Sequence, residues 1–291
     1  MLFSFCREAD ANSSRRHLVQ VITTSLVLLC GISSPRADQL DDGAAAYRRG
    51  DYKAAWELLR PLADQGVPRA QNGVGVMYAT GHGTDHDDAE AAAWFRKAAD
   101  QGYANAQARL GYLYRKGLGV PKDLDQARAL IQSAADKGDV TGEIYLANMY
   151  RLGEGVGRDN AKAAEYFRKA ADQGNAMAQA SLGAMYASGR GVPRDPVQAA
   201  AWHRKAAEQG NARSQLVLGA AYSAGIGVPK DFVQAYKWMS LGIERYQPWY
   251  AVYRWRLKLI CFALSWQMTR EQLVEGERLR TEWKPGKPKV N

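Results

Sequence analysis

The sequence predicts an all-α fold in which helix hairpins stack side by side into a solenoid. The first observation is a fixed step of 36 residues, at which Gly81, Gly117, Gly153, Gly189 and Gly225 begin five copies of a glycine-rich bend. The second is that apolar residues recur at helical spacing on both sides of each bend. A two-helix unit cannot bury its apolar face alone, whereas stacked copies can, so the repeat predicts a solenoid.

One copy, residues 103–138, shows how each hairpin is expected to form. Asn105 is predicted to cap the first helix, and Gly117 to end it in the left-handed conformation. Asp123 is predicted to cap the second helix, and Gln126 completes the pattern of a capping box with it. The bend "GLGVPKD" between the two helices is then a connector inside the hairpin.

The same bend invites comparison with a loop that binds phosphate. Such loops follow the pattern G-x-x-x-x-G-K-[ST] and use bare backbone N–H groups. Lys122 instead follows a proline, which has no N–H, and neither Ser nor Thr comes after it. A bend that is repeated five times at one spacing is typical of a structural connector, so phosphate binding is not expected.

Small and aromatic residues also keep the 36-residue step. Gly111, Ala147, Gly183 and Gly219 fall in the middle of the first helices, where they predict close approach of the paired helix. An aromatic ladder is predicted to lie in the core, with stacking of a substrate on it as the alternative. The ladder comprises Tyr78, Tyr114, Tyr150, Tyr186, Tyr222, Trp94, Trp202 and Trp238.

Residues 1–37 are predicted to be an export leader. Arg15 and Arg16 precede an apolar run at 18–32, which is short for a membrane span and typical of a secretion signal. Cleavage is expected between residues 33 and 37. The alternatives are a twin-arginine route and an uncleaved leader that anchors the chain in the inner membrane by residues 18–32.

Composition excludes several classes of function. The net charge of +9 is unevenly placed, with ten basic and five acidic residues in 242–291 and a repeat body that is only mildly basic. Because this is a basic end and not a basic patch along one face, no nucleic-acid partner is expected. Removal of the leader would leave Cys261 alone, which excludes an intrachain disulfide and a cysteine-based metal site. We expect no cofactor, no catalytic residues and no metal. The one cluster with metal-ligand chemistry is His82, Asp85, His86, Asp87 and Asp88, and Asp87 is better explained as a helix cap.

The repeated motif resembles a known family. Its pattern A-x-A-Q-x-x-L-G-x-x-Y-x-x-G-x-G-V-P-K-D-x-x-x-A-x-x-W-x-x-K-A-A-x-Q-G is similar to the Sel-one-like repeat, a relative of the tetratricopeptide repeat, with five copies over 69–246. Residues 38–68 resemble a tetratricopeptide-like opening hairpin. The third copy departs most, because Glu143 replaces the glutamine and Gly157 the proline. Some cysteine-rich relatives have been called β-lactamases, and this chain lacks their paired cysteines.

The resemblance implies a right-handed α-solenoid that acts as an adaptor for another protein. By analogy with tetratricopeptide arrays, the variable positions of the first helices should line the concave face. In copies two and three these are Arg109, Tyr112, Arg115, Lys116, Tyr145, Asn148 and Arg151. In copies four and five they are the smaller Ser181, Ala184, Ala187, Val217, Ala220 and Ser223. Arginine and tyrosine are typical of interface anchors, so a partner with an acidic segment is expected at copies two and three, and ordinary solvated surface is the alternative.

The last part of the chain is predicted to close the solenoid. Residues 247–283 read as capping helices, the second of which begins at Thr269 with Gln272 in a capping-box pattern. Residues 284–291 read as a disordered basic tail. The aromatic and basic stretch at 246–266 has an alternative interpretation as a helix that binds a membrane surface or nucleic acid.

Together these features favour a monomeric, non-enzymatic scaffold that is exported and binds another protein in the bacterial cell envelope. The resemblance implies the same role, because exported relatives include periplasmic regulators and envelope-assembly scaffolds. A membrane association is expected only through an uncleaved leader. The alternative is an accessory factor that binds or processes peptidoglycan in the concave groove.

Overall fold

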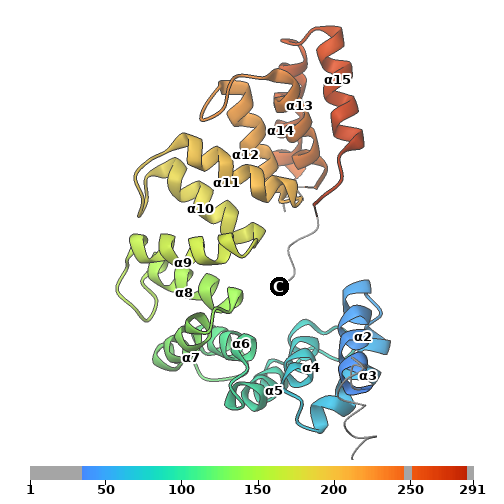
Figure 1. The fold of residues 1–291 in the computed structure, drawn as a ribbon, viewed down its shortest axis with the longest axis vertical. Coiled ribbons are helices and arrows are strands. Elements are labelled where there is room, and N and C mark those ends of the chain that lie inside the picture. The colour runs from blue at the N-terminus through green and yellow to red at the C-terminus, as the bar shows by residue number, and fades with distance from the viewer. Residues whose placement is uncertain (1–34, 246–250, 287–291) are drawn as a thin grey trace, which may run out of the picture. The chain divides into compact units, whose positions relative to one another are not determined.

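A computed structural model describes residues 35–245 and 251–286, and within these ranges the chain forms helices joined by bends, with no strand (Figure 1). The chain divides into two compact units, residues 1–86 and 87–291. In the described part, no helix has the length and apolar character needed to cross a membrane. The apolar run predicted to belong to the leader lies outside the described residues.

Within its described residues the first unit contains three helices, α2 (Pro35–Arg49), α3 (Tyr52–Asp64) and α4 (Pro68–Thr80). Consecutive helices pack on one another, and α3 contributes the buried Ala55, Leu59 and Leu62. Asp51 caps α3 by accepting a hydrogen bond from Ala54 N at 3.1 Å. The unit therefore has an apolar core of its own.

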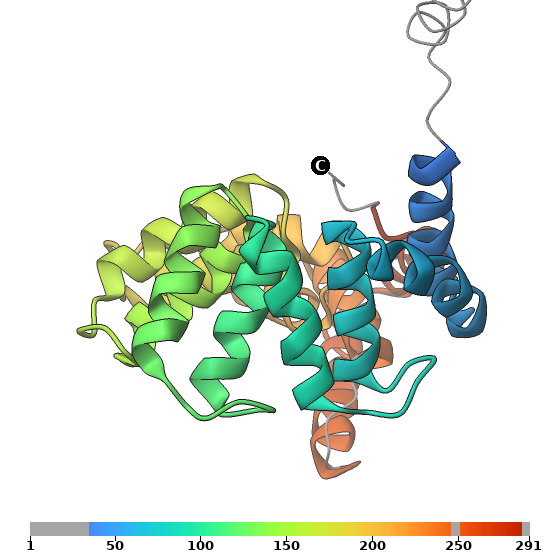
Figure 2. The same ribbon diagram turned by 90° about the horizontal axis from the view of Figure 1, so that it is seen from below.

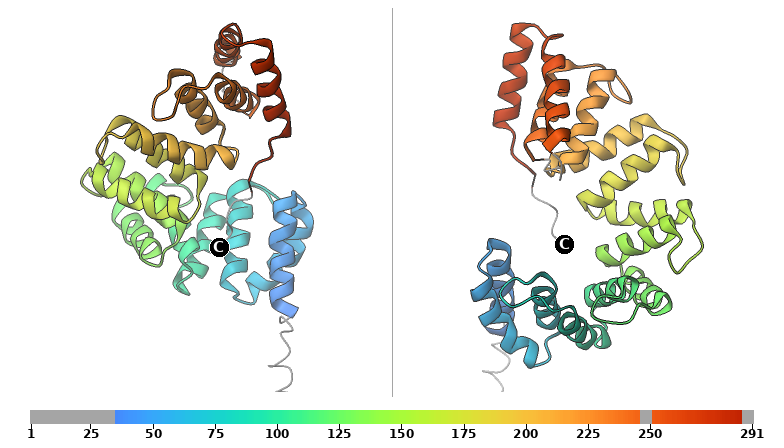
Figure 3. Two further views of the ribbon diagram at one scale, coloured as in Figure 1. Left: turned by 45° about the horizontal axis from the view of Figure 1, so that its top comes forward. Right: turned by 180° about the vertical axis from the view of Figure 1, so that it is seen from behind.

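The second unit is a succession of helix hairpins followed by two further helices (Figure 3). Its helices are α5 (Asp88–Asp100), α6 (Ala104–Lys116), α7 (Leu124–Asp136), α8 (Val140–Leu152), α9 (Asn160–Asp172), α10 (Ala176–Ser188), α11 (Pro196–Glu208), α12 (Ala212–Ala224), α13 (Phe232–Arg245), α14 (Ala251–Ser265) and α15 (Arg270–Glu282). Within a hairpin the two helices pack together, and the second helix packs on the first helix of the next hairpin. Each hairpin is thus buried between its neighbours.

The two glycines of each long bend have different roles. Gly117 has a φ of 72°, and its N–H donates to Leu113 O at 2.8 Å, which ends α6 as predicted. Gly119 touches the preceding hairpin, because a Cβ there would collide with the carbonyl oxygen of Asp88 at the start of α5. The first glycine ends a helix, and the second allows the bend to approach the neighbouring backbone.

The helix starts follow the prediction in part. Asp123 caps α7 by accepting from the backbone N–H groups of Asp125 and Gln126 at 3.0 and 2.9 Å. The predicted capping box differs, since the Gln126 side chain donates to the Asp123 carboxylate instead of accepting from the Asp123 N–H. The prediction for Asn105 is wrong: Tyr103 is the N-cap of α6, and no side chain caps that helix.

The small residues in the first helices lie where the paired helix approaches most closely. A Cβ at Gly111 would lie 2.6 Å from Cγ1 of Ile131 and 3.0 Å from the carbonyl oxygen of Ala127 on α7. Gly183 and Gly219 meet α11 and α13 in the same way. The predicted close approach is confirmed, and it accounts for glycine at positions that disfavour it in an isolated helix.

A polar ladder joins the hairpins inside this packing. Glutamine side chains at the same position of four copies donate to a carbonyl oxygen eight residues earlier, at 3.1–3.4 Å; they are Gln71, Gln107, Gln179 and Gln215. The third copy carries Glu143 there, which is 3% exposed and accepts from Gln173 Nε2 at 2.9 Å. Burial raises the pKa of Glu143 to about 7, because a charged carboxylate loses its hydration there.

The C-terminal helices pack on α13. Leu264 of α14 and Tyr236 of α13 belong to one apolar cluster, and Trp283 packs edge-to-face on Trp238 with ring centroids 6.2 Å apart. Thr269 and Gln272 form the predicted capping box at the start of α15. The first residues of the predicted tail, 284–286, are among the described residues, and Gly286 N donates to Glu208 O at 2.8 Å. The remaining tail, 287–291, lies outside the described residues.

Candidate functional site

The first helices of copies two and three are held together by stacked aromatic rings. Tyr112 on α6 and Tyr145 on α8 stack with ring centroids 5.1 Å apart and an interplanar angle of 27°. Burial raises the pKa of the Tyr145 hydroxyl, with the nearby Arg109 acting in the opposite direction. Both rings are half-buried, so much of their surface is used in packing one copy on the next.

Arg115 corrects the sequence interpretation. It was predicted as an exposed anchor, but its side chain is only 8% exposed and lies 5.3 Å from the centroid of the Tyr112 ring. Its Nη1 faces the Glu154 carboxylate, in the bend of the next copy, at 3.3 Å. A buried guanidinium paired across two copies is a structural joint, so Arg115 does not contribute to an open binding face.

The other predicted polar residues make mostly local contacts. Arg109 Nε donates to Asn105 Oδ1 at 2.8 Å, and Asn105 Nδ2 in turn reaches Asp139 and Thr141 of the next copy at 3.2 and 3.0 Å. Asn148 donates to Ile144 O and accepts from Arg151. Lys116 and Arg151 remain exposed. Copies two and three therefore offer few free anchors.

An open groove lies further along the same row of helices, between α8, α10 and α12. Its volume is about 710 Å³. Ser181, Ala184 and Ala187, which are predicted for this face, line it together with Ser188. Met177, Leu152 and Val217 add apolar surface and are 64%, 49% and 38% exposed. The groove exists because these small side chains leave space that tyrosine and arginine fill in copies two and three.

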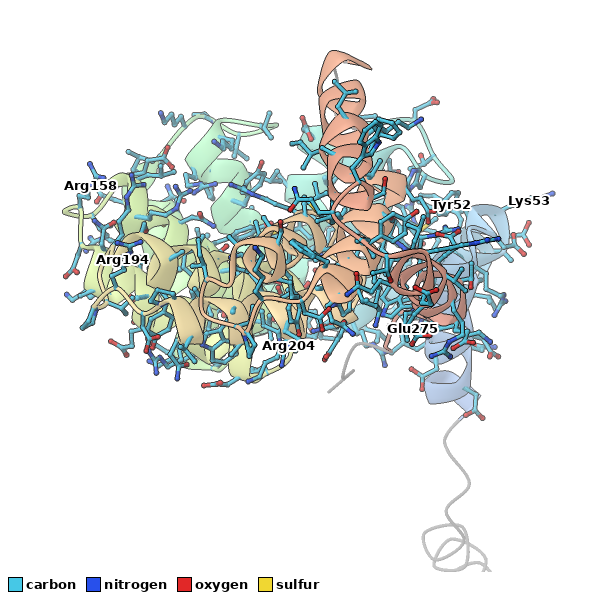
Figure 4. All side chains as sticks on the ribbon, turned by 90° about the horizontal axis from the view of Figure 1, so that it is seen from above. Tyr52, Lys53, Arg158, Arg194, Arg204 and Glu275 are labelled. Atoms are coloured by element: carbon cyan, nitrogen blue, oxygen red, sulfur yellow. The ribbon has the colours of Figure 1, made fainter. Side chains whose placement is uncertain are left out.

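Four arginines surround the groove, and none of the described residues that line it is acidic. They are Arg151, Arg158, Arg190 and Arg213, all exposed. No carboxylate in the described part of the chain forms an ion pair with any of them. Figure 4 shows Arg158 pointing outward from the bend between α8 and α9. Sequence reasoning named Arg151 and missed the other three, although a basic residue follows the bend glycines in several copies.

The floor of the groove contains a buried histidine. His203 of α11 is 4% exposed, and its Nδ1 lies 3.2 Å from the Ser214 hydroxyl of α12. The corresponding residue is Phe95 in the first copy and Phe167 in the third. Burial lowers the pKa of His203 to about 4, and the charge of Arg213 adds to the effect. The imidazole is therefore neutral at pH 7.

The aromatic ladder divides into buried and half-buried members. Trp94, Trp202, Trp238, Tyr114 and Tyr186 are buried, whereas Tyr78, Tyr150 and Tyr222 are half-buried. The tyrosine hydroxyls accept hydrogen bonds from arginines 18 residues earlier, as in the pairs Arg96–Tyr114, Arg168–Tyr186 and Arg204–Tyr222. Tyr150 lacks this arginine, because Gln132 occupies the position 18 residues earlier. Its ring instead stacks on that of Tyr166, with ring centroids 6.0 Å apart. The rings contribute to packing and the hydroxyls link helices.

The histidine and aspartate cluster does not converge. His82 stacks on Tyr52 with ring centroids 4.2 Å apart, while Asp87 caps α5 through hydrogen bonds from Ala89 N and Glu90 N. Among the described residues, no group of three or more His, Cys, Asp or Glu side chains could hold a metal ion. His82 is accounted for by aromatic packing and Asp87 by helix capping.

Comparison with solved structures supports the fold. The crystal structure of a Sel1 repeat protein from Oxalobacter formigenes is 27% identical, with a TM-score of 0.68 over 84% of this chain and 100% of that chain. An immunity protein from Pseudomonas aeruginosa is 19% identical, with a TM-score of 0.52 over 70% of this chain and 81% of that one, which shows likeness of fold alone. None of the curated proteins matches the chain. The predicted all-α solenoid class is confirmed.

The family model for the Sel1 repeat matches six segments, residues 41–67, 68–103, 104–139, 141–175, 176–211 and 212–245. The count is six and not the predicted five, because the model also matches part of the segment interpreted as an opening hairpin. Sel1 repeat proteins generally mediate protein–protein interaction, and the family is of a scaffold type that is generally non-enzymatic. With matches over most of its length, the chain belongs to the Sel1 repeat family.

Proposed function

We propose that this chain is a non-enzymatic scaffold, exported to the bacterial cell envelope, that binds an acidic segment of a partner protein in the groove between α8, α10 and α12. The observation that carries the proposal is the combination of an open groove of about 710 Å³ with four exposed arginines and no acidic lining residue. Arginine offers several donors in a planar fork, which suits carboxylates on the partner.

The chemistry of the groove favours a segment that is both acidic and apolar. Ser181 and Ala184 leave room for the partner's backbone and side chains to approach α10 closely. Met177 and Val217 supply exposed apolar contacts, and methionine adapts to different side chains. The partner's acidic residues would then face the surrounding arginines, whose charges also accelerate encounter at low ionic strength.

The export part of the proposal is supported by the order of residues in the leader. Arg15 and Arg16 precede the apolar run 18–32, as in secretion signals. N-terminal sequencing of the protein recovered from cells tests it. A mature start between residues 33 and 37 is expected, and a start at Met1 in a soluble cytoplasmic fraction would contradict it.

The binding part is tested by capture followed by measured affinity. A partner captured by the wild-type protein from envelope extract is purified, and its affinity is measured for the variants Arg151→Glu, Arg190→Glu and Ala184→Trp. The first two reverse a charge beside the groove, and the third fills it. Each is expected to weaken binding at least tenfold, because desolvated arginine anchors and apolar pockets carry much of the energy of an interface.

Lys122→Glu is the matched control, since it makes the same change in charge on an exposed bend away from the groove. It should alter affinity less than about threefold, and wild-type binding should weaken as salt rises. Equal affinity of wild type and Ala184→Trp would place the interface elsewhere. Turnover of muropeptides by the purified protein would contradict the non-enzymatic assignment.

A further inference from the structure

Helix α14 has one face packed in the structure. Leu264 is 4% exposed and belongs to a cluster with Ala235 and Met239 of α13. Cys261 and Met268 pack against the same cluster, and Cys261 Sγ lies 3.3 Å from the Ser240 hydroxyl. Cys261 and Leu264 lie on one side of α14, so this side, together with Met268 beyond the helix end, accounts for the attachment of α14 to α13.

A second apolar face of α14 is open. Leu259, Phe262 and Trp266 are 45%, 59% and 79% exposed, and Ile260 beside them is 50% exposed. Leu259 and Phe262 are three residues apart on one face of α14, and Trp266 follows directly after the last residue of the helix, Ser265. Phe262 and Trp266 contact each other edge-to-face with ring centroids 5.8 Å apart. An apolar patch of this kind is typical of a binding surface and not of ordinary solvated helix.

The surrounding sequence is basic and aromatic. Residues 246–269 contain no Asp or Glu, and they carry Arg254, Arg256 and Lys258. Lys258 is exposed and directly precedes the open face. The stretch also contains four tyrosines or tryptophans before residue 254, in addition to Trp255, Phe262 and Trp266. Figure 2 shows α14, in orange-red, extending beyond the helices on which it packs.

We propose that the open face of α14 binds the surface of an anionic lipid bilayer. In this arrangement the helix lies along the interface, with Leu259, Phe262 and Trp266 in the boundary between headgroups and acyl chains. Tryptophan and tyrosine favour that boundary, and basic side chains favour anionic headgroups. A helix of 15 residues is too short to span the bilayer, which agrees with a surface position.

Charge favours a lipid surface over a second copy of the chain. Two copies that met through this face would bring together two stretches with three basic residues and no acidic residue each. Like charges at such an interface oppose association, whereas an anionic surface attracts the same charges. The groove between α8, α10 and α12 is formed by other helices, so the proposal stands independently of the partner proposed for that groove.

The test measures binding of the full chain to vesicles together with local hydrogen–deuterium exchange. Vesicles of phosphatidylglycerol and phosphatidylcholine are compared with vesicles of phosphatidylcholine alone. We expect slower amide exchange in peptides from α14 on the anionic vesicles, and unchanged exchange in peptides from α12. The local readout separates α14 from the apolar run at 18–32, which could bind vesicles by itself.

The double variant Phe262→Ser/Trp266→Ser should abolish the protection of α14 by anionic vesicles. Its control is Val197→Ser/Ile226→Ser, which removes two apolar side chains that are 63% and 56% exposed, in α11 and in the bend after α12. The control should keep the protection within twofold. Exchange in α14 that does not respond to anionic vesicles would overturn the proposal. Protection of α14 that depends on protein concentration without lipid would overturn it in favour of a second copy.

Discussion

The first helices of the second unit form two different surfaces from one repeated plan. In copies two and three, Tyr112 stacks on Tyr145 and Arg115 pairs with Glu154, so large side chains fill the space between copies. In copies four and five, alanine and serine occupy the corresponding positions and leave an open groove. Residues that look like binding anchors therefore join the repeats here, and the smallest residues create the accessible site.

The two regions also differ in the titratable group that each buries. Glu143 replaces a glutamine of the polar ladder in copy three, and His203 replaces an aromatic core residue in copy four. Burial disfavours the charged form of both, so it raises the pKa of Glu143 to about 7 and lowers that of His203 to about 4. Lowering the pH should therefore stabilise copy three through Glu143 and destabilise copy four through His203.

The largest expected effect is the acid sensitivity caused by His203. Its pKa is lower in the folded state than the usual 6.5, so its contribution to stability is complete above pH 6.5 and is lost as the pH falls toward 4. We expect a loss of about 3 kcal/mol in the free energy of unfolding between pH 7 and pH 4 from this residue. In His203→Phe this loss should be absent, as measured by urea denaturation at both pH values.

The second comparison uses Glu143→Gln. The pKa of Glu143 is higher in the folded state than the usual 4.5, so its contribution is complete below pH 4.5 and is lost as the pH rises through about 7. Glutamine can also donate to Ala135 O, as the glutamines of the other copies do to the corresponding carbonyls. We expect the variant to be more stable than wild type by about 2 kcal/mol at pH 8. The same denaturation series should show the difference disappearing near pH 4.5, and a constant difference would contradict the assignment.

The third prediction concerns the joint between copies two and three. Replacing Arg115 with alanine removes a buried side chain that packs on Tyr112 and leaves Glu154 without its partner. We expect a loss of about 1–2 kcal/mol, which is less than for a fully buried pair because Glu154 is 37% exposed. Thermal and urea denaturation measure it, with Lys116→Ala on the exposed side of the same turn as the control.

The smallest effect is expected at the groove. Arg151→Ala and Arg213→Ala should each change the free energy of unfolding by less than about 0.5 kcal/mol, because both side chains are exposed and unpaired with any described carboxylate. A loss as large as that of Arg115→Ala would show that the arginines around the groove are structural, and the contrast between the two regions would fail.

Local rules in the sequence were enough to predict the hairpins. Gly117 ends a helix, Asp123 caps the next one, and Gly111 allows the paired helix to approach closely. Each role depends on residues nearby in the sequence or on the 36-residue repeat. The predictions for Asn105 and Arg115 were wrong because their partners lie in the next copy. The groove could be predicted from the sequence only in part, because its shape depends on several small side chains from three helices at once. The predicted exported location and acidic partner stay predictions.

The side chains that donate to the polar ladder have a consequence for the order in which the molecule assembles. Lys137, Gln173 and Gln209 donate to its members Gln107, Glu143 and Gln179. Lys137, Gln173 and Gln209 each reach back 35 residues, to the carbonyl oxygens of Gly102, Gly138 and Gly174. Each hairpin therefore packs on the hairpin that precedes it in the sequence. Contacts of such short sequence separation form quickly. The hairpins can therefore fold one after another from the N-terminal side as the chain is synthesised. The return of Gly286 to Glu208 bridges 78 residues, so it is a bond that can close only at the end.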